Sequence, residues 1–160
     1  EAAVQTLRQE VPDLHLATGG KPLEVPAPEG VTHFGLITDH ERMNLLLAAA
    51  DAVAVPSYQD NLPNVVIEAQ ACGTPAVGYP TGGIPDMIWP GETGWLAATQ
   101  SKEALVASLR QWLQEREAWP HYQRRAREVA ETHFSYQAQA QRLQGLYQAA
   151  LSGGGAAAPG

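Results

Sequence analysis

The segment that decides the fold is Val55–Ile88, which reads VPSYQDNLPNVVIEAQACGTPAVGYPTGGIPDMI. It combines an apolar strand, a turn that contains Asp60, a helix that contains Glu68, and a second strand. Such a unit can place a carboxylate on either side of a pocket at the carboxyl ends of parallel strands, where open α/β sheets bind nucleotides and sugars. The segment therefore predicts a ligand site that contains two acids.

Strands and helices alternate on both sides of this segment. Short apolar strands are expected at 14–18, 31–36, 52–55, 75–79 and 94–97. Helical spacing predicts helices over 4–11, 43–50, 64–73, 105–113, 122–130 and 136–151, with a short turn at 84–88. The pattern Thr38-x-x-Glu41 is typical of a capping box, so Thr38 is expected to cap the second helix. The alternation predicts a Rossmann-like α/β fold, with a doubly wound, mostly parallel sheet covered by helices on both faces.

Composition indicates one globular domain with a core, because the chain has 160 residues, of which 44% are hydrophobic. A net charge of −7 argues against nucleic acid as a partner. The basic trio Arg124, Arg125 and Arg127 is interpreted as a solvated helix face. No apolar run is long enough to span a membrane and no leader opens the chain, so a cytoplasmic location is expected.

Two local features are interpreted as structural. The single cysteine, Cys72, cannot form an internal disulfide and is predicted to be a small buried residue at a helix end. The segment 152–160 reads SGGGAAAPG and is expected to be a disordered tail. The folded domain is therefore expected to cover residues 1–151.

The helix that starts near Pro63 points its amino end at the loop that holds Asp60. Free backbone N–H groups and the helix dipole favour an anion there, and a nucleoside diphosphate would fit. Glu68 is four residues after Asn64 and shares its helix face, at a distance suited to ribose hydroxyls. Asp60 can hydrogen-bond a transferred sugar or stabilise positive charge at its anomeric carbon. The alternative is that Glu68 only favours helix formation and Asp60 only begins a turn.

The arrangement of these motifs resembles the carboxy-terminal, donor-binding domain of GT-B glycosyltransferases. The similar family is the large retaining group 1 (family 4-like), which includes glycogen and sucrose-phosphate synthases and bacterial envelope and exopolysaccharide transferases. Its pattern runs from Pro-Ser through Glu-Gly-Phe-Gly-x-x-x-x-Glu-Ala to Gly-x-Pro-Val. Here the matching motifs are Pro56-Ser57, Asp60-Asn61-Leu62-Pro63-Asn64, Glu68-Ala69, Gly73-Thr74-Pro75, Gly82-Gly83-Ile84-Pro85 and Gly91-Glu92-Thr93-Gly94. The resemblance covers roughly residues 14–98 and, more loosely, the final helices.

The resemblance implies a role for each matched residue. Asp60 would contact the donor sugar as the catalytic acid, and Glu68 would hold the ribose. Backbone groups of the segment after Asp60 would face the sugar and the pyrophosphate, namely those of Asn61, Leu62, Asn64 and Val65. Main chain at Leu36 and Ile37 would lie beside the base. No metal and no other cofactor are expected, because the nucleotide sugar is itself the substrate.

Two departures from the family pattern affect the sugar site. Asp60 is one methylene shorter than the usual Glu, and Asn61-Leu62-Pro63 replaces Gly-Phe-Gly. Part of the close backbone approach that glycine permits is therefore lost.

Other motifs do not predict a second site. Gly19-Gly20 follows a strand but lacks the dinucleotide-binding pattern, and Gly82-Gly83 is interpreted as turn geometry in a loop that borders the donor pocket. The histidines have no metal-ligand spacing and are interpreted as surface or packing residues: His15, His33, His40, His121 and His133. The tryptophans are interpreted as structural.

The resemblance also implies a missing first strand. In the family, a central strand and a loop that carries Arg and Lys precede the helix in which this chain opens. With the strand order 3-2-1-4-5-6, a gap is expected between the strands at 14–18 and 52–55, which would leave unpaired edges. The chain is therefore interpreted as part of a two-domain protein, and alone it is expected to be poorly stable and inactive.

The predicted function is transfer of a sugar, with retention, from a nucleoside diphosphate sugar to a hydroxyl acceptor, with this chain as the donor-binding half. The acceptor would be a glycan, a lipid or a small molecule. The other partners implied are an amino-terminal domain of the same protein and, for the full protein, a membrane surface bound peripherally. The alternatives are a non-catalytic nucleotide-sugar-binding module and a GT-B-like nucleotide-sugar epimerase or phosphorylase.

Overall fold

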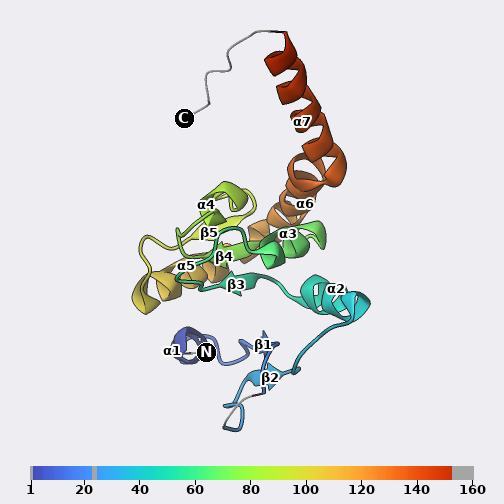
Figure 1. Cartoon of the computed structure of the whole chain (residues 1–160). Helices are drawn as coiled ribbons and strands as arrows, with labels where there is room; N and C mark the ends of the chain where they lie inside the picture. Colours follow the sequence, from blue (N-terminus) through green and yellow to red (C-terminus); the bar gives the residue numbers. More distant parts are fainter. Residues whose placement is uncertain (1, 23–24, 153–160) are drawn as a thin grey trace.

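The computed structural model describes residues 2–22 and 25–152. Strands alternate with helices as far as β5, and the rest of the chain is helical (Figure 1). The first elements are α1 (Ala2–Arg8), β1 (Leu16–Thr18), β2 (Val31–His33), α2 (His40–Ala49), β3 (Val53–Val55), α3 (Asn64–Ala71) and β4 (Ala76–Gly78). They are followed by α4 (Ile84–Met87), β5 (Gly94–Leu96), α5 (Lys102–Gln114), the 3-10 turn η1 (Arg116–Ala118), α6 (Trp119–Val129), the π-helical turn η2 (Ala130–Phe134) and α7 (Tyr136–Leu151). The predicted α/β class is confirmed.

The five strands form two separate parallel sheets. One contains β1 and β2, and the other has the order β3-β4-β5. Within the described ranges, β1 and β3 are not hydrogen-bonded to each other. The break lies between the two strands where the family's strand order predicts a gap.

The three-stranded sheet is packed on both faces. Alternate residues of its strands point to opposite sides, so Val77 and Trp95 pack with residues of α1, α5 and α6, whereas Ala76 packs with residues of α3 and α4. Trp95 stacks edge-on against Tyr122 of α6, with ring centroids 4.6 Å apart. This sandwich gives α3, the helix that carries Glu68, a rigid base.

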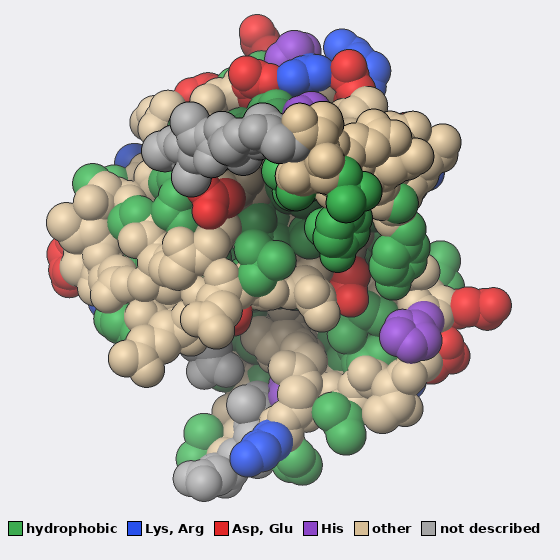
Figure 2. Space-filling model, turned by 45° about the horizontal axis from the view of Figure 1, so that its top comes forward, with side chains coloured by type: hydrophobic (Ala, Val, Ile, Leu, Met, Phe, Trp, Pro, Cys, Tyr) green, Lys and Arg blue, Asp and Glu red, His purple; other side chains and the backbone are tan. Residues whose placement is uncertain are grey.

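The final helix, α7, projects away from the sheets, at the opposite end of the molecule from α1, β1 and β2 (Figure 1). None of its sixteen residues is buried. Its exposed apolar side chains include Leu143, Leu146, Tyr147 and Leu151. On the face turned forward in Figure 2, apolar side chains gather around a hollow, and acidic and basic side chains mix along its upper rim.

The capping prediction for α2 is wrong by one residue. Asp39, not Thr38, is the N-cap: its backbone is extended, and its carboxylate accepts a 2.9 Å hydrogen bond from the amide of Glu41. An aspartate next to the helix competes with the preceding threonine for the same free N–H groups, so α2 begins at His40. The strands are also one to three residues shorter than predicted.

Several structural interpretations are confirmed. Cys72 is at the end of α3 as predicted, where it is the C-cap, but it is half-buried rather than buried, and Gly73 follows it with a φ of +80°. Arg125 pairs with Glu92 and Glu128, and Arg127 pairs with Glu131, so carboxylates balance two of the three arginines on this helix face. Residues 153–160, most of the predicted tail, lie outside the described residues.

In the part of the chain that the structure describes, none of the helices combines the length and apolar character needed to cross a membrane.

Candidate functional site

Three loops meet at the carboxyl edge of the three-stranded sheet. The loop after β3 carries Asp60, the loop after β4 contains Thr81, and the loop after β5 contains Gln100. Because the strands are parallel, these loops leave the sheet at the same edge. The Thr81 hydroxyl and the Gln100 amide both donate to the backbone carbonyl of Tyr58, at 3.2 and 3.3 Å. The loop that carries Asp60 is therefore held by the loops after the two neighbouring strands.

The amino end of α3 is open to an anion. The helix begins at Asn64, and its N-cap is Pro63, a residue with no polar side chain, so no side-chain hydrogen bond caps the helix. The amide of Val66 donates to the carbonyl of Pro63 at 3.0 Å, whereas the backbone N–H groups of Asn64 and Val65 receive no side-chain cap and lie beside the positive end of the helix dipole. Val66, two residues into the helix, is fully buried against β3 and β4, which fixes the direction in which these groups point.

The predicted donor residues lie on both sides of this helix end. Asp60 is half-buried in the preceding loop, and Asn61 and Leu62 follow it on the surface. Glu68 is exposed on the second turn of α3. It shares a face with Asn64, since the two are four residues apart in the helix. Along the chain, the open helix end thus follows the half-buried Asp60 and precedes the exposed Glu68.

Leu36 and Ile37 lie in the segment between β2 and α2, at the carboxyl end of the other sheet. Leu36 is exposed, whereas Ile37 is half-buried. Ile37 lines an open, mainly apolar pocket of about 230 Å³ together with Phe34, Arg42, Leu45 and Leu46. A flat apolar group such as a nucleobase could enter a pocket of this kind.

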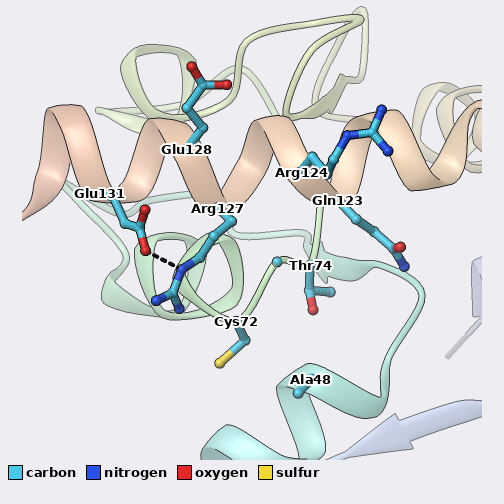
Figure 3. Close-up of a pocket in the computed structure, with 9 residues that line it drawn as sticks. Ala48, Cys72, Thr74, Gln123, Arg124, Arg127, Glu128 and Glu131 are labelled. Carbon is cyan, nitrogen blue, oxygen red and sulfur yellow. Dashed lines mark hydrogen bonds and ion pairs between the residues drawn. The ribbon is translucent and has the colours of Figure 1, made fainter.

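A larger cavity, of about 490 Å³, lies at the other end of α3 (Figure 3). It is lined by Cys72 and Thr74 near the carboxyl end of α3, by Ala48 of α2, and by residues of α6 and η2. Arg127 points into it and is bonded to Glu131 and to the carbonyl of Ala71. Burial raises the pKa of the Cys72 thiol, so the thiol is not activated as a nucleophile. This cavity contains none of the predicted donor residues.

Sequence reasoning missed the side chains that hold the Asp60 loop. Thr81 and Gln100 were not predicted as site residues, although each follows a strand of the sheet and so lies at the edge where ligands bind. Their position directly after a strand was the feature of the sequence that could have indicated them as site residues. Their contacts with Tyr58 bridge 23 and 42 residues of sequence, and no local pattern indicates them.

The fold is that of the carboxy-terminal domain of a GT-B glycosyltransferase. Residues 3–131 match the family described as "Glycosyl transferases group 1". The chain therefore belongs to that family.

Individual relatives agree with this assignment. A D-inositol 3-phosphate glycosyltransferase from Corynebacterium glutamicum is 39% identical over 104 residues, which are 65% of this chain and 25% of that protein. Sucrose-phosphate synthase from Thermosynechococcus elongatus superposes with a TM-score of 0.72 at 27% identity, over 94% of this chain and 42% of that one. HepE from Anabaena, solved in complex with UDP-glucose, shares the fold, with a TM-score of 0.62 at 17% identity over 92% of this chain and 53% of its own. The chain spans about a quarter of the length of the curated relatives it matches.

Proposed function

We propose that this chain binds a nucleoside diphosphate sugar and supplies the donor half of the active site of a retaining glycosyltransferase. The observation that carries the proposal is the uncapped amino end of α3, which lies between the loop of Asp60 and the carboxylate of Glu68. Membership of the glycosyl transferases group 1 family supports it. So does the UDP-glucose complex of HepE, a protein with the same fold.

Each part of the donor is assigned to one feature of this edge. The diphosphate would accept hydrogen bonds from the first-turn N–H groups of α3, at Asn64 and Val65. Glu68, one turn further along the same face, would accept hydrogen bonds from the ribose hydroxyls. The base would lie at the apolar pocket beside Ile37. Asp60 would contact the sugar.

The proposed chemistry follows from where charge develops. When the bond from the anomeric carbon to the diphosphate breaks, negative charge grows on the leaving oxygen and positive charge grows on the sugar. The helix end stabilises the negative charge on the leaving oxygen, and the carboxylate of Asp60 stabilises the positive charge on the sugar. An acceptor hydroxyl would attack on the face from which the diphosphate leaves and would pass its proton to the leaving diphosphate oxygen, which gives retention.

Calorimetric titration of the full-length protein with UDP and with UDP-glucose tests the donor assignment. Glu68→Gln should weaken both ligands, because both contain the ribose. Asp60→Asn should weaken UDP-glucose while leaving UDP unchanged, because only the sugar faces Asp60. Glu117→Gln, which changes an exposed carboxylate of η1, serves as the control. The assignment is contradicted if Asp60→Asn weakens UDP and UDP-glucose equally, or if Glu68→Gln leaves the Kd of UDP unchanged. GDP and ADP sugars test whether another base is preferred.

Product analysis then separates the functions that share donor binding. Sugar transfer to an added hydroxyl acceptor supports the proposal. Conversion of the donor to an isomer without an acceptor would indicate an epimerase, and binding without turnover would indicate a non-catalytic module.

A further inference from the structure

We propose that the loop after β4 is a support that sets the position of the donor-sugar loop, and that Thr81, Gly82, Gly83 and Gln100 are positioning residues for the sugar. Two names are used below: the acid loop is 56–63, and the glycine loop is 80–83. The inference rests on the proposed function, since it assigns the acid loop to the donor sugar.

The two loops are in direct backbone contact. The amide of Gly83 donates a 2.7 Å hydrogen bond to the carbonyl of Asn61. A Cβ atom at Gly83 would lie 2.5 Å from that same oxygen and 2.8 Å from Cδ1 of Leu62. Any side chain at this position would therefore push the acid loop away from the sheet edge.

Two independent features of the structure require glycine at position 82. Its φ is +51°, in the left-handed region that side chains disfavour, and a Cβ atom there would overlap the backbone carbonyl of Asp60. The contact is with the backbone of the proposed catalytic residue itself. The identity of residue 82 thus determines where Asp60 can lie.

Side chains hold the other end of the acid loop. The Thr81 hydroxyl donates to the carbonyl of Tyr58 at 3.2 Å, and it accepts a hydrogen bond from the amide of Gln100. The Gln100 amide also donates to the Tyr58 carbonyl, at 3.3 Å. Side chains from the loops after β4 and β5 therefore donate to the same carbonyl group, two residues before Asp60.

The diphosphate site does not depend on this support. The direction of α3 is set by the fully buried Val66, which belongs to a core cluster with Val55 of β3 and Ala76 of β4. A change in the glycine loop should therefore displace Asp60, Asn61 and Leu62 while leaving the first-turn N–H groups in place. The expected signature is weaker binding of a nucleotide sugar with unchanged binding of the nucleotide alone.

Titration of the full-length protein with UDP and UDP-glucose tests this. Thr81→Val should raise the Kd of UDP-glucose about fivefold, the factor expected for one lost neutral hydrogen bond, with the Kd of UDP unchanged. Gly83→Ala should have the same selectivity, because its methyl group would displace the carbonyl of Asn61. Thr81→Ser keeps the hydroxyl and should restore wild-type affinity. Gly145→Ala is the control for adding a methyl group alone, because Gly83 has an ordinary φ of −88° and nothing lies within 4 Å of the Cβ position of Gly145 in α7.

The outcomes are distinguishable. If Gly83→Ala fails to fold, Thr81→Val and Gln100→Ala decide the question, since neither introduces a clash. The inference is overturned if Thr81→Val binds UDP-glucose like the wild type, if UDP and UDP-glucose weaken equally, or if Thr81→Ser is no better than Thr81→Val. A wild-type protein that binds neither ligand would overturn the proposed function as well. Wild-type binding with unaffected variants overturns only the positioning role.

Discussion

The buried hydroxyl of Thr74 donates a 2.7 Å hydrogen bond to the backbone carbonyl of Leu47, which joins the start of β4 to the last turn of α2. The two partners are associated with different sheets. Leu47 is in α2, which follows the two-stranded sheet and the segment that contains Ile37, whereas Thr74 lies between α3 and β4 of the three-stranded sheet. This bond therefore helps to fix the proposed base pocket relative to the proposed diphosphate site.

Thr74→Val should destabilise the protein by about 0.5 to 1.5 kcal/mol, because it removes one of two hydrogen bonds to the Leu47 carbonyl, which also accepts from the amide of Ala50. The substitution preserves shape, so no cavity contributes to the loss. Urea denaturation measures the free energy of unfolding, and Thr74→Ser, which retains the hydroxyl, is the control. An unchanged midpoint for Thr74→Val would mean that water or another donor replaces the hydroxyl.

A second buried amide supports the sheet from the α3 side. The fully buried Gln70 side chain donates to the carbonyl of Met87 at 2.7 Å and to the hydroxyl of Thr93 at 3.2 Å. Gln70→Met keeps a similar shape but removes both donors, and we expect a loss of about 1 to 3 kcal/mol in unfolding free energy. Gln137→Met, at an exposed position of α7, should change stability by less than about 0.5 kcal/mol. Similar effects of the two substitutions would show that the Gln70 bonds contribute nothing specific.

Much of the fold could be predicted because its signals are local. The alternation of apolar runs and helical patterns identified the parallel strands around α3, and the family frame located the break between β1 and β3. Element ends were less accurate. Thr38 and Asp39 are adjacent residues that both cap helices well, and only the folded backbone decides between them.

The candidate site shows the same division between local and distant signals. Asp60 and Glu68 could be proposed from one continuous segment, since a helix end and its flanking loop are close in sequence. The support from Thr81 and Gln100 could not, because it requires knowledge that β3, β4 and β5 are neighbours in that order. Gly82-Gly83 was correctly interpreted as turn geometry, but its contact with Asp60 and Asn61 depends on the packing of two loops.

Sugar transfer by the full-length protein should not require a divalent metal. The partial positive charge at the uncapped end of α3 is placed where the leaving diphosphate would lie, and it can stabilise the developing charge without an ion. We therefore expect the same transfer rate in EDTA as in magnesium buffer. Loss of activity in EDTA that returns when magnesium is added would show that a cation shares this role.

Tyr122 provides a test of stability at alkaline pH. A hydrogen bond from its hydroxyl to the carboxylate of Glu115, together with burial, raises the pKa of Tyr122 from 10 to about 12. A pKa that is higher in the folded state means that the interaction stabilises the protein fully below pH 10, and that the contribution is lost as the pH rises toward about 12. Tyr122→Phe should therefore be less stable than the wild type by about 1 to 2 kcal/mol at neutral pH, as expected for a partly exposed hydrogen bond to a charged group.

The difference between wild type and Tyr122→Phe, measured by urea denaturation, should shrink between pH 10 and about 12. Comparing the two proteins at each pH removes the titration of other groups, including Tyr79, whose pKa is also raised, mainly by burial. Tyr136→Phe, at an exposed position of α7, should show no such pH dependence. A Tyr122→Phe difference that stays constant through this range would mean that the hydroxyl contributes packing rather than a hydrogen bond to the Glu115 carboxylate.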